Sequence, residues 1–333
     1  MSNKITTFQL CSLMLINDIF VIFCLCGRIS AATAAGFGLG SLIQLIAAIP
    51  LICMYKKRGT LSDCGKIAEI ILLGGIILWG GMLFSMLMKA GTLVLIPFEE
   101  VGKWGGIITT ALIAVVCLYI ASSGIKAMSR SAVIAAALGA VCLGAVTVSA
   151  VIHSDMENIK SADSTGFFRE LSKGFTLSGG LAGFTVMLGF VKDNIPRTAI
   201  GYFIGKAVIT AVVLIAGVLV CGGIMEITDF PIVWAAQLTQ PFSVQRIDSL
   251  FLIVFTVFAV YSISVQASAA EYLVGEVFPF IRRYRCSIIL VIMAVVGAVS
   301  GQWIYGNVFT AILSVGGLIT VPIIYFIKRK ISL

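Results

Sequence analysis

Long apolar runs recur along the whole chain and limit it to one class of fold. A helix crosses a bilayer core of about 30 Å with about 20 apolar residues, and ten segments of the sequence approach this measure. Their spans are 6–26, 33–55, 67–88, 105–122, 131–152, 175–191, 198–223, 248–274, 286–302 and 307–327. The strands of a transmembrane β-barrel would instead alternate over about ten residues. The sequence therefore predicts an all-α integral membrane protein with ten transmembrane helices.

Composition agrees with a membrane protein and argues against several other classes. Of the 333 residues, 59% are hydrophobic and 11% are charged, and the mean hydropathy is +1.10. The nine cysteines are scattered without paired metal-ligand spacing, and the only histidine, His153, lies at a predicted helix end. No phosphate-binding loop of the G-x-x-x-x-G-K-[ST] type is present. We therefore expect no metal, no cofactor and no enzymatic activity.

The distribution of basic residues predicts how the chain is oriented, because cytoplasmic loops retain positive charge. If the N-terminus is cytoplasmic, most of the 23 lysines and arginines fall on the cytoplasmic side. These are Lys4, Lys56, Lys57, Arg58, Lys66, Lys126, Arg130, Lys192, Arg197, Lys206, Arg282, Arg283, Arg285, Lys328, Arg329 and Lys330. Since the charge is divided among short loops, the net charge of +8 needs no nucleic-acid partner. We expect a multi-pass protein of the cell membrane with both termini in the cytoplasm.

A polar external loop over about 153–173 divides this single transmembrane domain into two halves, about 1–152 and 174–333. Each half contains five predicted helices, and an odd number makes the second half enter the membrane from the opposite side. That topology is a 5+5 inverted repeat, which in secondary transporters places the ligand site at mid-membrane beside interrupted helices. We expect interruptions in helices 1 and 6. Ten helices divided by a loop are also compatible with two unrelated halves.

Helix 1 contains two polar side chains, Asn17 and Asp18, at the middle of an apolar run. An acid at this depth is unfavourable by about 2.5–3.5 kcal/mol, so it normally faces a cavity or a partner. Asp18 could coordinate a cation, pair with the amine of a ligand, or carry a proton. The alternative is a protonated Asp18 that is hydrogen-bonded to a neighbouring helix, with Asn17 as an ordinary interhelical contact.

Helices 6 and 8 supply the other candidate ligand-binding residues. Helix 6 reads TLSGGLAGFTVMLGF, and its glycines suit a break in which the backbone contacts a ligand. Helix 8 carries a polar stripe at helical spacing that could form the opposing wall. The candidates are Ser178, Gly179, Gly180 and Gly183 in helix 6, and Tyr261, Ser264 and Ser268 in helix 8. Small residues of this kind also occur as plain packing seams between membrane helices.

Three stretches resemble the spore germination permeases, the B subunits of nutrient germinant receptors. They are the segment Asp229–Phe278, with Phe230-Pro231 and Gln245-Arg246-Ile247-Asp248, the loop Ser123–Ala132, and the N-terminal Ile5–Leu10. That family is similar to the amino acid/polyamine/organocation transporters. The resemblance implies a ten-helix inverted repeat and a small-molecule site between helices 1, 3, 6 and 8. Unlike the family, this chain has INDIF instead of glycine at the break expected in helix 1.

The sequence leaves three functions open: a leading hypothesis, an alternative from another class, and a third hypothesis without ligand binding. The first is a subunit of a spore germinant receptor that binds a small nutrient, most simply an amino acid, in the spore inner membrane beside A-type and C-type subunits. The alternative is an autonomous amino acid transporter driven by protons or sodium, in which Asp18 is the coupling site. The third is a structural membrane subunit with a vestigial pocket.

Overall fold

The computed structural model describes a helical protein over most of the chain. It covers residues 4–25, 30–57, 59–92, 102–152, 158, 167–168, 180–222, 229–238, 247–279, 284–300 and 308–331. The helices are α1 (Thr7–Phe23), α2 (Ala31–Lys56), α3 (Leu61–Cys64), α4 (Lys66–Ala90), α5 (Gly102–Ser122), α6 (Ile125–Ile152), α9 (Leu181–Leu188), α10 (Ile195–Cys221), α11 (Pro231–Leu238), α12 (Ile247–Val277), α13 (Arg285–Ser300) and α14 (Val308–Ile331).

Each of the ten predicted segments contains one of these helices, and the protein is an all-α, multi-pass membrane protein. Six helices of the described residues are long and apolar enough to cross a bilayer. They are Ala31–Lys56, Lys66–Ala90, Gly105–Ser122, Ile125–Ser149, Ile195–Cys221 and Leu250–Val277. The apolar helices Thr7–Phe23 and Arg285–Val299 are shorter. Ten crossings therefore stay a prediction.

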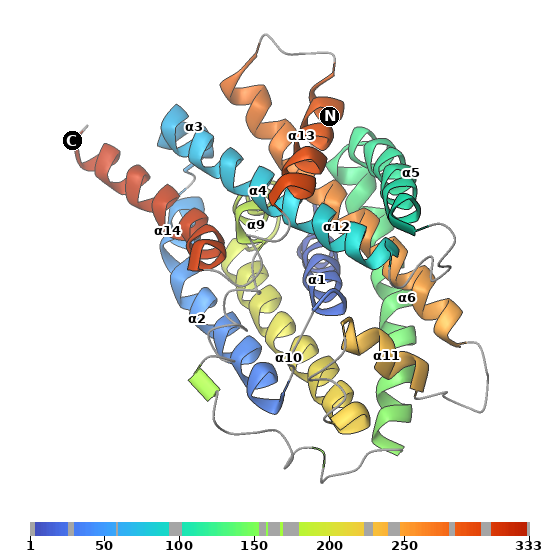
Figure 1. Cartoon of the computed structure of the whole chain (residues 1–333). Helices are drawn as coiled ribbons and strands as arrows, with labels where there is room; N and C mark the ends of the chain where they lie inside the picture. The colour runs from blue at the N-terminus through green and yellow to red at the C-terminus, as the bar shows by residue number, and fades with distance from the viewer. Residues whose placement is uncertain are drawn as a thin grey trace.

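Helix α1 lies in the middle of the bundle, packed against α6, α10 and α12 (Figure 1). It begins at a capping box in which the Thr6 side chain accepts from Gln9 N–H and the Gln9 side chain accepts from Thr6 N–H. From Ser12 on, nearly every side chain of α1 is buried. The Phe23 ring packs on Phe251 of α12, with ring centroids 4.7 Å apart. A helix surrounded in this way can hold polar side chains away from lipid.

The expected interruption of helix 1 at Asn17 and Asp18 is wrong. Helix α1 is continuous from Thr7 to Phe23, so the two polar residues lie within regular helix. The segment has no glycine or proline there, and an unbroken helix satisfies its own backbone hydrogen bonds at membrane depth. Any ligand contact at this position must therefore come from side chains.

The sixth predicted segment contains a short helix instead of a full crossing. Helix α9 begins after Gly180, whose φ of 87° is left-handed, and it ends at Leu188. The left-handed conformation favours glycine because a Cβ atom would be crowded there. Ser178 and Gly179, together with the rest of 175–179, lie outside the described residues.

Glycines bring α4 and α13 close together. A Cβ atom added at Gly80 would lie 2.5 Å from Met293 Sδ, and one added at Gly81 would lie 2.6 Å from a Val296 methyl carbon. Small residues at such a contact allow two membrane helices to approach closely, which strengthens their dispersion contacts. The contact fixes α4, which also packs against α12 and carries Trp79 into the interior.

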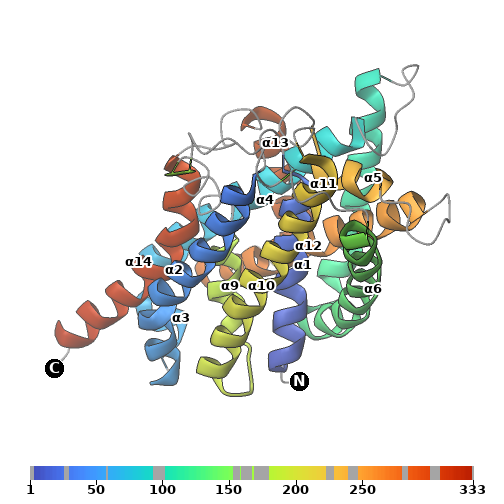
Figure 2. The ribbon, with the colours of Figure 1, turned by 90° about the horizontal axis from the view of Figure 1, so that it is seen from below.

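The N-terminus joins the two halves at one end of the bundle. Ile5 N–H donates to the Phe190 carbonyl oxygen at 2.9 Å, and Lys192 N–H donates to the Ile5 carbonyl oxygen at 3.0 Å. The start of α1, the short α3 and the C-terminal end of α14 lie at this same end, with α2, α10, α1 and α6 running side by side (Figure 2). The start of α1 and the end of α14 thus lie at the same end of the bundle.

Candidate functional site

A buried ion pair joins α1 to α10. Lys206 Nζ lies 3.1 Å from Asp18 Oδ1, and the Tyr202 hydroxyl donates to Asp18 Oδ2 at 2.7 Å. The Lys206 side chain is 0% exposed and that of Asp18 is 4% exposed. An acid that would be costly in hydrocarbon is thereby neutralised by a cation of the same chain. Both carboxylate oxygens of Asp18 are engaged inside the protein instead of being open to a ligand.

Helix α10 supplies this partner from a polar stripe at a spacing of four residues. Thr198, Tyr202, Lys206 and Thr210 are all buried on one side of α10. Thr198 Oγ1 lies 2.7 Å from Thr7 Oγ1, so the stripe follows α1 from its first turn to its middle. The assignment of Lys206 to the cytoplasmic side is wrong, because burial within α10 removes it from the loops that set orientation.

A second polar cluster lies one residue away on α1. Gln266 Nε2 of α12 donates to Asn17 Oδ1 at 3.4 Å. The other polar ends, Asn17 Nδ2 and Gln266 Oε1, are buried and have no hydrogen-bond partner among the described residues, and the same holds for Trp79 Nε1 of α4. An unpaired buried donor or acceptor costs about 1–3 kcal/mol. These three atoms belong to α1, α4 and α12, and they lie near one another inside the bundle.

The glycines of α9 lie directly against this cluster. A Cβ atom added at Gly180 would lie 2.7 Å from Asn17 Nδ2 and 3.1 Å from Trp79 Nε1. One added at Gly183 would lie 2.5 Å from Gln266 Oε1. The backbone at the start of α9 thus approaches all three unpaired atoms. The amide groups of its first turn have no acceptor within the helix, and they favour a negatively charged or carbonyl oxygen.

The structure brings together only some of the residues predicted from the sequence. Asn17, Gly180 and Gly183 meet in the cluster described above, and Asp18 adjoins it. Tyr261, Ser264 and Ser268 are buried on α12. Ser264 donates to the Cys117 carbonyl oxygen of α5 at 3.2 Å, and the Ser268 hydroxyl lies 3.9 Å from Met128 Sδ of α6. These two serines face α5 and α6, away from the partner of Asn17.

Four residues at the site, Gln266, Trp79, Lys206 and Tyr202, were not predicted as site residues from the sequence. Gln266 lies on α12 between the two serines, on the face that packs against α1, and Trp79 is one of many large residues in an apolar run. Lys206 had a recognisable signal, since a lysine in the middle of an apolar segment requires an acid, and Asp18 was the evident candidate. The spacing of Tyr202 and Lys206 by four residues also indicated a common face.

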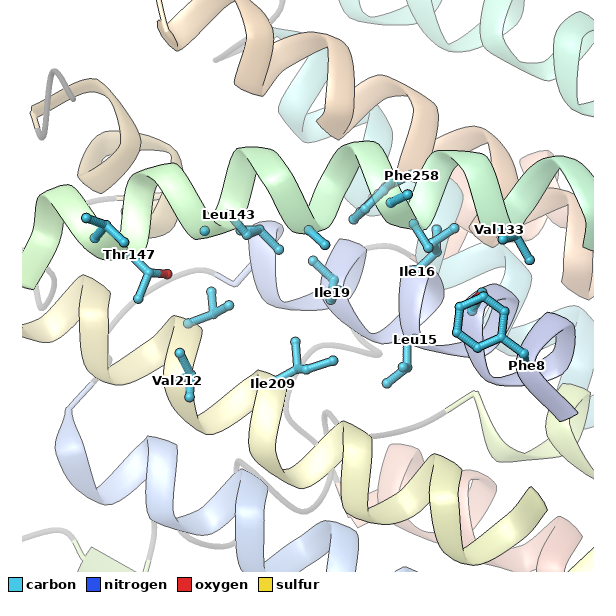
Figure 3. A pocket seen from close by; sticks show the side chains of 17 residues that line it. Phe8, Leu15, Ile16, Ile19, Val133, Leu143, Thr147, Ile209, Val212 and Phe258 are labelled. Carbon is cyan, nitrogen blue, oxygen red and sulfur yellow. The ribbon is translucent and has the colours of Figure 1, made fainter. Parts of the chain in front are cut away.

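Two cavities of the described residues lie away from the cluster. One, of about 640 Å³, is bordered by α1, α6, α10 and Phe258 of α12, with side chains that are almost all apolar (Figure 3). The other, of about 410 Å³, is polar and is lined by Ser268, Glu271, Tyr272, Glu276 and Arg285 among others. Ser268 lines this second cavity, which opens to the surface near the Ile5–Phe190 end of the bundle.

Comparison with known proteins gives the fold and no closer relationship. No protein-family model matches the chain, and no curated protein matches it. Among solved structures, the chain is similar to Mhp1 in its inward-facing conformation, with a TM-score of 0.50 and 13% sequence identity over 95% of this chain and 76% of Mhp1. The spore germination family is therefore a resemblance in short stretches alone. At this identity the likeness shows that the chain shares the fold of Mhp1.

Proposed function

We propose that the chain is a secondary transporter of a small polar molecule, held between α1, α4, α9 and α12. The observation that carries the proposal is the meeting, at the start of α9, of three buried atoms that have no hydrogen-bond partner among the described residues: Asn17 Nδ2, Trp79 Nε1 and Gln266 Oε1. Two of these atoms are donors and one is an acceptor. Mid-membrane sites beside a short or interrupted helix are where secondary transporters bind their ligands.

An amino acid is the ligand class that these groups suit best. Its carboxylate would accept hydrogen bonds from Asn17, Trp79 and the backbone amides in the first turn of α9, where the helix dipole favours negative charge. Its amino group would donate to Gln266 Oε1. The transporter fold supports an amino acid as the ligand. A 5+5 inverted repeat and cytoplasmic termini are further parts of the proposal.

The experiment compares ligand binding by purified wild-type protein with binding by Trp79→Phe, using calorimetry with a panel of amino acids, sugars and nucleosides. The substitution removes the indole N–H and keeps an aromatic ring. Loss of one hydrogen bond to a charged group costs about 1.5–3 kcal/mol, so we expect affinity to fall by roughly 10- to 100-fold.

The matched control is Trp234→Phe, because Trp234 is 49% exposed on α11. Its affinity should equal that of the wild type. Uptake of the bound ligand into liposomes would then establish transport. No binding across the panel, or equal affinities for Trp79→Phe and the wild type, would contradict the proposed site.

A sensing subunit of a spore germinant receptor is the second candidate function. It is supported by the resemblance of the stretch Asp229–Phe278, which contains α11 and α12. A sensor would bind the same ligand without moving it across the membrane, and it would co-purify with A-type and C-type receptor subunits. Ligand uptake by liposomes that contain this chain alone favours the transporter.

A further inference from the structure

The search for a further site leads back to the ion pair between α1 and α10, which the proposed ligand cluster does not use. Lys206 Nζ lies 3.1 Å from Asp18 Oδ1, and the Tyr202 hydroxyl donates to the other carboxylate oxygen, Asp18 Oδ2, at 2.7 Å. The Lys206 ammonium also lies 5.7 Å from the centre of the Tyr202 ring, within the range of a cation–π contact. A carboxylate and an aromatic ring thus surround an ammonium group, as they would surround a bound cation.

We propose that Asp18 and Tyr202 form a cation site whose resident cation is the ammonium group of Lys206, so that the protein takes no sodium ion at Asp18. Occupancy by Lys206 is independent of the proposed function. The consequence for transport, which is that ligand binding and uptake need no sodium at this site, rests on the proposed function.

The first argument is the backbone of α1. Sodium sites in secondary transporters use carbonyl oxygens that are freed where a helix is unwound. Helix α1 is continuous through Asn17 and Asp18, so its carbonyl oxygens stay within the helix. An ammonium group needs only a few hydrogen-bond acceptors around it, and Asp18 Oδ1 supplies one of them at 3.1 Å.

The second argument is that the cation is tethered and enclosed. Lys206 is fixed to the middle of α10, which gives its ammonium a high effective concentration at Asp18 that a dissolved ion must exceed. The ring of Phe184 stacks on that of Tyr202 with centroids 4.7 Å apart, and Phe203 packs on the same ring at 4.9 Å. With Asp18 and Lys206 both buried, an ion from solution would have to displace the lysine.

The test replaces the tethered cation with a free one. Lys206→Ala removes three carbons and the ammonium, so propylammonium is the matching probe and 1-propanol is its uncharged control. Thermal unfolding of the full chain in detergent is followed at constant ionic strength. We expect propylammonium to raise the melting temperature of Lys206→Ala by about 2 °C or more, and 1-propanol to have no such effect.

The specificity control is the double variant Asp18→Asn/Lys206→Ala, which lacks the acid and should not respond to propylammonium. Equal effects of propylammonium and 1-propanol on Lys206→Ala would overturn the proposal. These outcomes concern stability, so they stand apart from whether the amino acid panel yields a ligand.

A second measurement needs no variant that must fold without Lys206. The melting temperature of the wild-type protein is compared in sodium chloride and choline chloride at equal ionic strength. We expect no difference. A sodium-dependent rise that disappears in Asp18→Asn/Lys206→Met would overturn the proposal, since it would show that sodium binds at Asp18 despite the lysine.

Discussion

Removing the ammonium of Lys206 should be among the most destabilising single changes in this protein. At the observed separation of 3.1 Å, an effective dielectric constant of about 20 gives a Coulomb energy of about 5 kcal/mol. Lys206→Met keeps most of the side-chain volume but leaves the Asp18 carboxylate buried without its cation. Loss of one partner of a buried pair typically costs about 3–5 kcal/mol. We expect Lys206→Met to lower the free energy of unfolding by this amount.

A double-mutant cycle separates an ion pair from an ordinary hydrogen bond. Hydrogen bonds between membrane helices contribute about 0.6 kcal/mol on average, and about 1.7 kcal/mol at most, in such cycles. An ion pair between Asp18 and Lys206 should give a coupling energy of about 3 kcal/mol or more. Asp18→Asn/Lys206→Met should therefore be more stable than the sum of its single variants implies.

The assay is reversible unfolding in detergent of the wild type, the two single variants and the double variant. Lys126→Met is the matched control, because the Lys126 side chain is exposed, and its stability should stay within about 0.5 kcal/mol of the wild type. A coupling energy below about 1.7 kcal/mol would refute the ion pair. It would favour the alternative of a protonated Asp18 that is hydrogen-bonded to α10.

Three further predictions test the ligand cluster, the surface and the topology. Gly180→Ala forces a left-handed φ of 87° on a residue with a Cβ atom, so the variant should lose about 1–2 kcal/mol of stability and also ligand affinity. The control Gly74→Ala, with no atom near its added Cβ atom, should lose neither. Equal calorimetric affinities of the two variants for the ligand would contradict the site. Lys89→Ala breaks a salt bridge to Asp229 whose side chains are 43% and 48% exposed, so its unfolding free energy should change by no more than about 1 kcal/mol. In a background without native cysteines, Lys57→Cys and Lys89→Cys should be labelled by impermeant reagents from opposite sides of the membrane, since α4 crosses between them; labelling from the same side would contradict that crossing.

The positions of the helices could be predicted because apolar length is a local property. A run of about 20 apolar residues must form its hydrogen bonds within itself in a bilayer, so each segment identifies its own secondary structure. Long helices such as α10 and α12 were found in this way. The prediction was wrong at helix 1, where an interruption was inferred from the repeat topology although the local sequence lacks a residue that breaks helices.

The candidate site was predicted in part, because a sequence shows which residues are out of place and does not show what they meet. Asn17 and Gly180 were recognised as unusual at membrane depth, and both lie in the polar cluster. Gln266, which the sequence analysis did not consider, donates to Asn17, whereas the predicted Ser264 donates to the Cys117 carbonyl oxygen, because α12 has polar residues on more than one buried face. Only packing against the neighbouring helices determines which face of α12 contacts α1.

The sequence by itself determined that this chain is a helical membrane protein, because hydropathy and helix length follow from residues that are adjacent in the chain. It also determined that Asp18 must face either a cavity or a partner, since a lone carboxylate is costly in hydrocarbon. Only the tertiary structure decided that the partner is Lys206 with Tyr202, and that Asn17, Trp79 and Gln266 share one site. These contacts join residues from different helices, and their energies depend on packing and desolvation that exist only once the helices have assembled.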